Sequence, residues 1–435
     1  MAYTGEVTRG GPPDIRDLGG LTITKVSVGP MDNNAYLLRS GDEQLLIDAA
    51  NDAETLIALA GDAHLATIVT THSHADHWQA LEAVVAATGA ESLAQMEGRV
   101  FSTGPQGESP TAASEVVLTE EELAEIQGMG ATAAIVMHYS GDDWSAAQIA
   151  GLHDQLGKMG IEVIAETDAD FQAQTQVSDI ETVLARNPSI IVSIPTDPVA
   201  TASAYRQAAE QGVKIVFMDN VPQGFTPGED YISVVSADNY GNGIASAHLM
   251  AEALGGEGQV GIVFHAADFF VTRQRYDAFK ATIEENYPNI EITEEQGIAG
   301  PDFAGQADQA ASAMLTRNAE LNGIWAVWDV PAEGVINAIR TAGRENDVVV
   351  TTIDLGQNVA ISLAQGGIVK GLGAQRPFDQ GVTEAKLAGY GLLGKEAPPF
   401  VALPALPVTR ENVLEAWQEV YHQDPPQPLQ DAAAQ

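Results

Sequence analysis

The sequence predicts an α/β protein in which a two-lobed domain of parallel sheets follows a smaller α/β segment. Strand-like and helix-like stretches alternate regularly from about residue 130 to residue 394. The alternation starts again after DYISVVSADN (230–239), so it forms two similar series. Residues 21–90 have a different pattern of short strands, and a stretch rich in Gly, Ser, Pro and Thr separates them from the two series. These three observations define the predicted organisation.

The first segment is predicted to contain four short strands and a helix. LTITKVSV (21–28), NAYLLRS (34–40) and EQLLIDAA (43–50) are apolar or β-branched runs between polar turns, as is typical of strands. ATIVTT (66–71) is a fourth such run, and it leads through HSHADHW into a helical stretch at 78–89. A polar loop between a strand and a helix is where α/β folds usually place their chemistry.

Residues 91–114 are predicted to form a linker. They show no sustained period of 2 or 3.6 residues, which are the periods of strands and helices. We therefore expect a fragment at 1–90, the linker, and a two-lobed domain at 115–435.

The two later series each repeat a strand–helix unit, as in TAAIVMHY followed by WSAAQIAGLHDQLGKMG. Repeated units of this kind imply a parallel sheet with helices on both faces. We expect a first lobe at about 130–236 and a second at about 240–372, with the remainder crossing back to the first lobe. Two such lobes have a ligand site in the crevice between them, at the carboxyl ends of the strands.

The composition limits the possible partners. The chain has 60 acidic and 20 basic residues, a formal net charge of -40, and such a surface repels nucleic acid and anionic lipid. It has no cysteine, which excludes disulfides and thiolate metal sites. No apolar run approaches the roughly 20 residues that cross a bilayer. The first residues, MAYTGEVTRGGPPDIRDLGG, lack a basic and then apolar leader, so the chain as written is expected in the cytoplasm.

From about residue 118 to residue 429 the sequence resembles the type I periplasmic sugar-binding proteins, the ribose-binding-protein-like components of ABC transporters. The resemblance rests on SIPTDPVA, FMDN, VVSADNYGNG, TRQRYDAF, TTIDLG and GLGAQRPFDQG, in this order and at strand ends. It implies the two-lobed periplasmic-binding-protein type I fold, a sugar or polyol ligand held by hinge closure, and a permease as partner. It also implies that no cofactor is required, and we expect a monomer.

The resemblance implies a set of ligand-binding residues. Carboxylates, an arginine and an amide would bind sugar hydroxyls, and aromatic rings would cover the C–H face of the sugar. The matching positions are Asp142, Asp143, Trp144, Asp197, Arg273, Phe303, Asp354 and Gln375. Trp328 departs from the family, because ribose binders have an asparagine there, and a ring in place of an amide favours a different sugar, a polyol or a small polar cyclic ligand.

Simpler roles are open for some of these residues. Asp197 and Asp354 each precede a predicted helix and could be N-caps. Arg273 could pair with neighbouring acidic groups, and Trp144 and Trp328 could belong to the core. Asp219 and Asn220 of FMDN are expected to organise the crossover between lobes rather than to contact ligand.

The stretch HSHADH resembles the HxHxDH motif of metallo-β-lactamase-fold hydrolases. In that family His72 and His74 would bind one metal ion, and Asp76 and His77 a second, with zinc as the possible metal. A working site also needs later ligands, in an HTPG-like loop, a GD turn and a late histidine, which we do not find. The fragment is a truncated α/β metallo-β-lactamase-like fragment, since about 70 residues cannot build the two-sheet sandwich of that fold. It could be an inactive product of gene fusion, a weak metal binder, or a site completed by another chain.

The sequence therefore favours a non-enzymatic solute-binding domain for a sugar or polyol. The alternative is a zinc-dependent hydrolase whose second domain presents the substrate. A third reading is the effector domain of a transcription regulator, but no helix-turn-helix precedes it and the negative charge opposes DNA binding.

Overall fold

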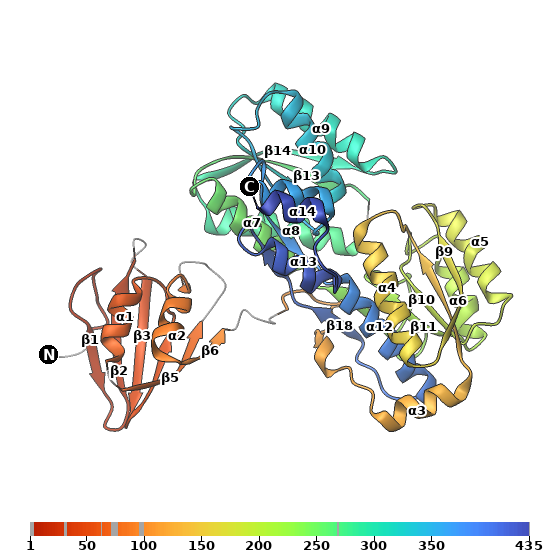
Figure 1. The fold of residues 1–435 in the computed structure, drawn as a ribbon, viewed down its shortest axis with the longest axis horizontal. Helices are drawn as coiled ribbons and strands as arrows, with labels where there is room; N and C mark the ends of the chain where they lie inside the picture. The colour runs from red at the N-terminus through yellow and green to blue at the C-terminus, as the bar shows by residue number, and fades with distance from the viewer. Residues whose placement is uncertain are drawn as a thin grey trace. The chain divides into compact units, whose positions relative to one another are not determined.

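The computed structural model divides into two compact units, residues 1–99 and residues 100–435 (Figure 1). It describes residues 4–29, 33–61, 63–70, 77–94, 100–267 and 269–434. The two units are described separately.

The N-terminal unit is a six-stranded sheet with two helices. Its strands follow chain order, the first four antiparallel and the last two added in parallel: β1 (Asp14–Asp17), β2 (Thr22–Val28), β3 (Asn33–Ser40), β4 (Glu43–Ile47), β5 (His64–Thr70) and β6 (Glu91–Ala94). The helices are α1 (Ala53–Ala60) and α2 (Leu81–Thr88). Leu56 of α1 and Val84 of α2 are buried against Leu46 and Ile68 of the sheet, so one apolar core holds the unit together.

The first lobe of the second unit is a parallel sheet in the order β7-β18-β12-β11-β10-β8-β9. Its strands are β7 (Thr111–Ala112), β8 (Thr132–Met137), β9 (Glu162–Asp168), β10 (Ile190–Ser193), β11 (Lys214–Met218), β12 (Ser233–Ala237) and β18 (Phe400–Leu403). Its helices are the 3-10 turn η2 (Ala113–Glu115), α3 (Glu120–Met129), α4 (Asp143–Lys158), α5 (Ala173–Leu184), α6 (Ala202–Glu210) and α12 (Pro377–Leu393).

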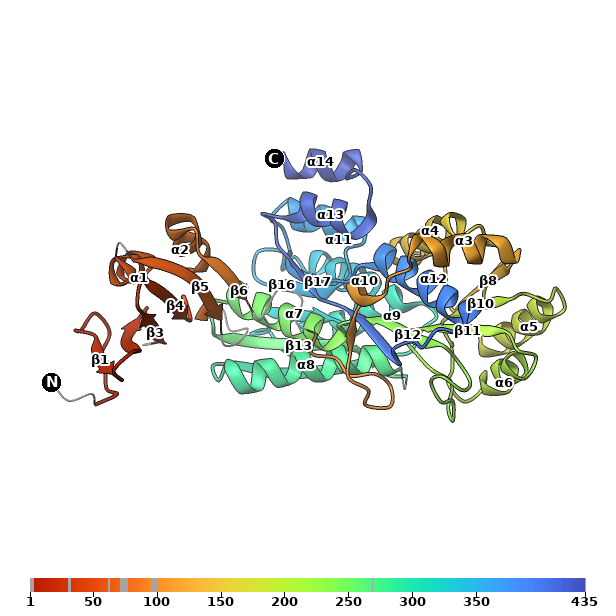
Figure 2. The same cartoon turned by 90° about the horizontal axis from the view of Figure 1, so that it is seen from below.

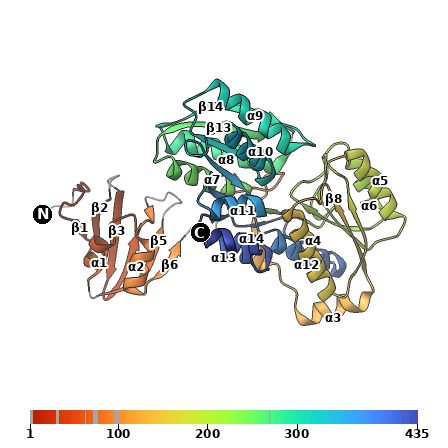
Figure 3. The ribbon, with the colours of Figure 1, turned by 45° about the horizontal axis from the view of Figure 1, so that its top comes forward.

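Both faces of this sheet are buried, which explains why its strands read as continuous apolar runs. Alternate residues of a strand point to opposite faces. Ala133 and Ile135 of β8 pack with α4 and α12, whereas Ala134 and Val136 pack with α5 and α6. Figure 3 shows these two pairs of helices on opposite sides of the sheet.

The second lobe has a sheet in the order β14-β13-β15-β16-β17-β19. Its strands are β13 (Gly258–His265), β14 (Ile290–Ile298), β15 (Gly323–Ala326), β16 (Val349–Ile353), β17 (Val369–Ala374) and the antiparallel β19 (Leu406–Val408). Its helices are α7 (Asn239–Ala253), α8 (Phe270–Asn286), α9 (Phe303–Arg317), α10 (Asp329–Thr341), α11 (Gln357–Ala364), α13 (Val413–Tyr421) and α14 (Gln427–Ala433). Helices α7 and α8 cover one face, and α11, α13 and α14 lie over the other (Figure 2). None of the helices in the described ranges is long and apolar enough to cross a membrane.

The chain crosses between the lobes three times, after β12, after β17 and after β18. The sequence predicts that everything after residue 372 returns to the first lobe, but only α12 and β18 do so, and β19, α13 and α14 join the second lobe. The difference arises because β19 is three residues long and pairs with β17, whose paired residues lie more than 30 positions earlier in the chain. Nothing in its own pattern indicates that pairing.

The stretch expected to be a linker is also partly structured. Residues 91–94 form β6 of the N-terminal sheet, and β7 pairs with β18. The backbone amides of Phe101 and Ser102 each donate to the carboxylate of Asp238 at 2.9 Å. These partners lie more than 130 residues away along the chain, so composition alone does not reveal them.

Candidate ligand-binding site between the lobes

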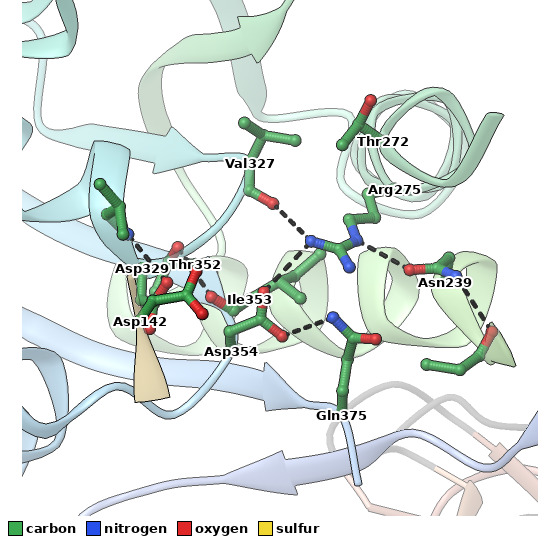
Figure 4. Close-up of polar contacts among 12 residues, drawn as sticks. Asp142, Asn239, Thr272, Arg275, Val327, Asp329, Thr352, Ile353, Asp354 and Gln375 are labelled. Carbon is green, nitrogen blue, oxygen red and sulfur yellow. Dashed lines mark hydrogen bonds and ion pairs between the residues drawn. The ribbon is translucent and has the colours of Figure 1, made fainter. Parts of the chain in front are cut away.

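Four buried polar side chains form a network at the carboxyl ends of the second-lobe strands (Figure 4). Arg275 of α8 is 4% exposed, and its Nε donates to Oδ1 of Asn239 at 2.8 Å. A terminal nitrogen of the same guanidinium lies 3.3 Å from Oδ2 of Asp354. The amide nitrogen of Gln375 donates to Oδ1 of Asp354 at 2.7 Å. Asp354 and Gln375 follow the neighbouring strands β16 and β17, which is why they meet at one edge of the sheet.

Asp354 has an unusual backbone conformation and is buried. Its φ of 71° is in the left-handed region, which Asp tolerates better than most residues. Burial raises the pKa of Asp354, while the Arg275 charge and the hydrogen bond from Gln375 act in the opposite direction. The carboxylate is therefore buried but paired, as buried charges need to be.

Three further carboxylates lie near this pair. Asp329 begins α10 and is 5% exposed, and burial, followed by the charges of Asp354 and Asp142, raises its pKa well above the usual range. Burial also raises the pKa of Asp142, with a smaller contribution from Asp354. Asp219, after β11, accepts from Ser236 Oγ at 2.6 Å, and burial raises its pKa to about 6. The region around Asp354 is therefore acidic.

Several buried polar atoms of this region have no hydrogen-bond partner among the described residues. They are Trp144 Nε1, Asn220 Nδ2, Gln375 Oε1, both side-chain polar atoms of Gln380, and Glu384 Oε2. The other oxygen of Glu384 accepts from Gln148 at 2.6 Å. Most buried polar groups in native proteins are hydrogen-bonded. Buried polar groups gathered in one region can form hydrogen bonds with a polar ligand.

Aromatic rings form a continuous wall that joins the two lobes. Phe171 follows β9 in the first lobe, and its ring lies 5.2 Å from that of Phe303 in the second. Phe303 in turn lies 4.8 Å from Trp328. Burial lowers the pKa of His138 and of His265 to about 4, so these two imidazoles, which contact the same rings, are neutral near pH 7. Such rings can cover the apolar face of a ligand.

Six of the residues that the resemblance implies contribute to this crevice or its wall. They are Asp142, Trp144, Phe303, Trp328, Asp354 and Gln375. Asp143 is exposed, and its Oδ2 accepts from the backbone amide of Gln357 at 2.8 Å, which links α4 to the start of α11. Their binding of ligand stays a prediction.

The remaining two residues are placed differently. Asp197 accepts from the backbone amides of Val199 and Ala200 at 2.8 and 2.7 Å, so one carboxylate oxygen caps the turn before α6. Arg273 is exposed, and the arginine in the network is Arg275. Positions two apart lie on different sides of a helix, and the buried side of α8 contains Val271, Thr272, Arg275, Ala278 and Phe279. That helical period was the available signal for Arg275.

Asp219 and Asp329 were not predicted as site residues either. Asp219 directly follows β11, and Asp329 is the third residue after the end of β15. Both are almost completely buried. A single acidic residue at that position also reads as a helix cap or a turn residue, so the sequence pattern gave no reason to select them.

The predicted metal ligands are only partly visible. His72, His74 and Asp76 lie outside the described residues. His77 Nδ1 lies 2.9 Å from Oδ2 of the buried Asp48, the kind of carboxylate contact that orients a metal-binding histidine. The described residues of the chain contain no group of three His, Asp or Glu side chains placed to hold a metal ion. A zinc site takes at least three protein ligands, so the visible part supplies too few.

Comparison with known families gives two matches. The model described as "Periplasmic binding protein domain" matches residues 133–396. The model described as "Metallo-beta-lactamase superfamily" matches residues 28–143. The first match covers more than half of the chain and contains the whole network around Arg275.

Curated relatives and solved structures agree with the first match. The D-allose-binding periplasmic protein of Escherichia coli is 25% identical over 280 residues, which is 60% of this chain and 86% of the relative. The ribose import binding protein RbsB of Bacillus subtilis is 24% identical over 255 residues, 58% of this chain and 79% of the relative. An ABC sugar transporter subunit from Rhodobacter sphaeroides is 27% identical with a TM-score of 0.58, and the match covers 65% of this chain and 99% of that one.

A solute-binding protein from Agrobacterium vitis, solved with alpha-D-tagatopyranose, is 23% identical with a TM-score of 0.62, and it covers 67% of this chain and all of that chain. At 23% identity this similarity shows only that the two chains share a fold. The predicted fold class is thus confirmed by the parallel sheets and by these matches. The chain belongs to the periplasmic binding protein family, with the fold of the type I sugar-binding proteins, and it carries a metallo-β-lactamase-like region at its N-terminus.

Proposed function

We propose that residues 100–435 are the solute-binding component of an ABC transporter and take up a sugar or polyol between the lobes. The observation that carries the proposal is the buried Arg275–Asp354–Gln375 network. Arg275 also lies 3.4 Å from the carbonyl oxygen of Val327, the residue before Trp328. Charge-assisted hydrogen bonds suit hydroxyl groups, and the aromatic wall suits the C–H face of a sugar ring. The names of the relatives, which bind allose and ribose, support the same ligand class.

Ligand binding would be coupled to hinge closure. The three crossing segments form the hinge, and the backbone amide of Asp238 donates to the carbonyl of Leu403 at 2.7 Å, which ties two of them together. The contacts that would break on opening are Asp143 with Gln357 and Phe171 with Phe303. Hinge closure around a ligand is the usual motion of such two-lobed proteins.

The pocket favours a ligand other than ribose. The ring of Trp328 lies 5.5 Å from His265 and against Phe303. An indole at this position offers an apolar face where an amide would offer two hydrogen-bonding groups. We therefore expect a ligand whose apolar face meets Trp328.

Thermal unfolding with a broad panel of sugars and polyols tests the proposal. A ligand that binds only the native protein stabilises it by about 2.7 kcal/mol at a concentration 100 times Kd. Arg275→Ala should abolish the shift because it removes the donor for the ligand and for Asp354. Arg317→Ala, at the exposed end of α9 where Arg317 pairs with Glu294, is the control and should leave the shift unchanged. A panel without any shift, or an Arg275→Ala protein with an intact shift, contradicts the proposal.

The N-terminal match leaves the second candidate, a zinc-dependent hydrolase. The contact between His77 and Asp48 favours it, but we propose that the chain has no hydrolase activity. Elemental analysis of the purified chain should find less than two tightly bound zinc ions. Two zinc ions together with a hydrolysis that His72→Ala abolishes, while His153→Ala on the first lobe preserves it, would establish the enzyme instead.

A partner permease would receive the ligand at the outer face of the cytoplasmic membrane, so the domain would work there, as a monomer. Fractionation of cells that express the full gene and scattering from the purified chain test these two points. A cytoplasmic dimer would contradict both.

A further inference from the structure

We propose that residues 101–112 form a strap across the hinge, which holds the two lobes together and limits how far they open. The strap lies outside residues 133–396, the range that matches the family model. It is attached at three places, to the hinge itself, to the second lobe and to the first lobe. The inference concerns the motion of the lobes, so it holds whichever ligand the crevice takes.

The first attachment is to Asp238, where the chain passes from β12 of the first lobe to α7 of the second. Asp238 is fully buried, and its backbone amide donates to the carbonyl of Leu403 in another crossing segment. One carboxylate oxygen accepts from the backbone amide of Phe101, and the other accepts from the amide and the hydroxyl of Ser102, all at 2.9 Å. Hydrogen bonds to a carboxylate are stronger than those between neutral groups, so the start of the strap is fixed to the hinge.

The second attachment is to the first two helices of the second lobe. Ser102 Oγ accepts from the backbone amide of Tyr240, in the first turn of α7, at 3.0 Å. The carbonyl of Thr103 accepts from the side-chain amide of Gln274, on α8, at 3.0 Å. These two bonds tie the strap to the lobe that contains Arg275.

The third attachment is to the first lobe. The side-chain amide of Gln106 donates to the carbonyl of Phe225, in the loop after β11, at 2.6 Å. Gly104 packs against Phe400 of β18, since a Cβ atom at Gly104 would lie 3.0 Å from the Phe400 side chain. The strap ends in β7, which pairs with β18. A segment that only covered one lobe would have its partners in that lobe alone.

The middle of the strap is a closed turn. The backbone amide of Gly104 donates to the carbonyl of Glu108, and that of Gly107 donates to the carbonyl of Gly104, both at 2.9 Å. The amide of Gln106 donates to the Glu108 carboxylate at 2.7 Å. Because these bonds hold the turn compact, the strap cannot lengthen without breaking them.

The strap is also too short to follow a wide opening. Thr103 and Gln106, which are held by different lobes, are three residues apart and can be separated by at most about 11 Å. Their partners, Gln274 and the loop with Phe225, follow the carboxyl ends of β13 and β11. The crevice lies between these ends of the two sheets, so opening moves the partners apart. A wide opening must therefore break one of the two glutamine bonds.

Hydrogen exchange of the unmodified full chain tests whether the strap is fixed. Amides in stable parts of a fold exchange slowly, because their exchange requires local opening. After correction for intrinsic rates, the peptide with Phe101 and Ser102 should exchange more slowly than one with the exposed residues Glu345 and Asn346. Equal rates would show that the strap is not held and would overturn the inference.

Distances between the lobes test whether the strap restrains them. The chain has no cysteine, so Gln174→Cys on α5 and Gln309→Cys on α9, both exposed, can each carry one spin label. In this labelled chain, Ser102→Ala with Gln274→Ala removes the bonds of the strap to the second lobe. Double electron–electron resonance on the ligand-free protein should then give a distribution shifted to longer distances, because open forms become more populated.

The control is Ser189→Ala with Gln430→Ala, which removes two hydrogen bonds of the same kinds within single lobes. It should leave the distance distribution as in the parent. Urea unfolding establishes that both double variants fold. If the strap variant does not fold, Gln274→Ala alone, at a partly exposed position, gives the same test with a smaller shift. A folded strap variant with the parent's distribution refutes the inference, and so does an equal shift in the control, which would indicate general loosening.

Discussion

Removing Arg275 should destabilise the ligand-free protein, independently of any ligand. Its side chain and that of Asp354 are 5% and 8% exposed and lie 3.3 Å apart. Arg275→Ala leaves Asp354 buried without its cation and removes the donor to Asn239. Breaking a buried pair on one side costs about 3–5 kcal/mol, whereas an exposed substitution such as Arg273→Ala should stay within about 0.5 kcal/mol.

The loss should depend on pH with a definite sign. Burial raises the pKa of Asp354 and Arg275 opposes that rise, so without Arg275 the folded-state pKa moves further above the unfolded value of about 3.9. A raised carboxyl pKa means that the folded state binds the extra proton, so the variant loses stability as pH rises above about 4. The deficit of Arg275→Ala relative to the parent should therefore be larger at about pH 7.5 than at about pH 5.

Urea unfolding at the two pH values, followed by tryptophan fluorescence, measures the effect. Four of the five tryptophans lie beyond residue 100, so the signal reports mainly on this unit. Arg273→Ala is again the matched control. If Arg275→Ala costs no more than Arg273→Ala, or if its deficit does not change with pH, the buried-pair reasoning is wrong.

Three other predictions follow from single contacts. Asp219→Asn keeps an oxygen that accepts from Ser236 and removes a carboxyl whose pKa burial raises to about 6. The variant should be more stable than the parent by about 1–3 kcal/mol near pH 7.5 and by little near pH 4. Urea unfolding without this pH dependence contradicts the prediction. Gly356→Ala places a Cβ 2.1 Å from Asp329 Oδ2 and should lower the free energy of unfolding by about 1–3 kcal/mol. Gly367→Ala is the control, because its Cβ meets its nearest atom at 3.4 Å. Equal urea midpoints for the two variants would refute the clash. Phe171→Ala removes the ring between His138 and Phe303, so open forms of the ligand-free protein should become more populated. Small-angle scattering should then give a larger radius of gyration. An unchanged radius would show that the ring does not hold the lobes together.

The fold was largely predictable, and β8 illustrates why. Its residues alternate between two helix-covered cores, so a short apolar run followed by a helix is sufficient to indicate a parallel strand. β7 and β19 were not predicted, because each has three residues or fewer and is defined by a partner strand far away in the chain. Two or three residues are too few to show the alternation of apolar and polar residues by which a strand is predicted.

The sequence indicated the region of the candidate site better than the individual side chains that form it. The ends of β16 and β17 indicated that Asp354 and Gln375 lie close together, and the two side chains are hydrogen-bonded. The helical period of α8 indicates that Arg275 is buried and Arg273 is exposed. The burial of the Asp329 carboxylate has no such signal in the sequence. A resemblance to a family indicates which strand ends form the site. The burial of individual side chains, which requires the structure, indicates which of them have an unusual environment.

The position of β18 has a consequence for synthesis on the ribosome. This strand, residues 400–403, lies between β7 and β12 in the first-lobe sheet. During synthesis the strand edge of β12 therefore stays unpaired while the second-lobe elements from α7 to β17 are made. β7 cannot join the sheet before β18 emerges. Exposed strand edges invite association with other chains. A holding factor that shields nascent chains would thus be needed most during the interval in which residues 238–400 are translated.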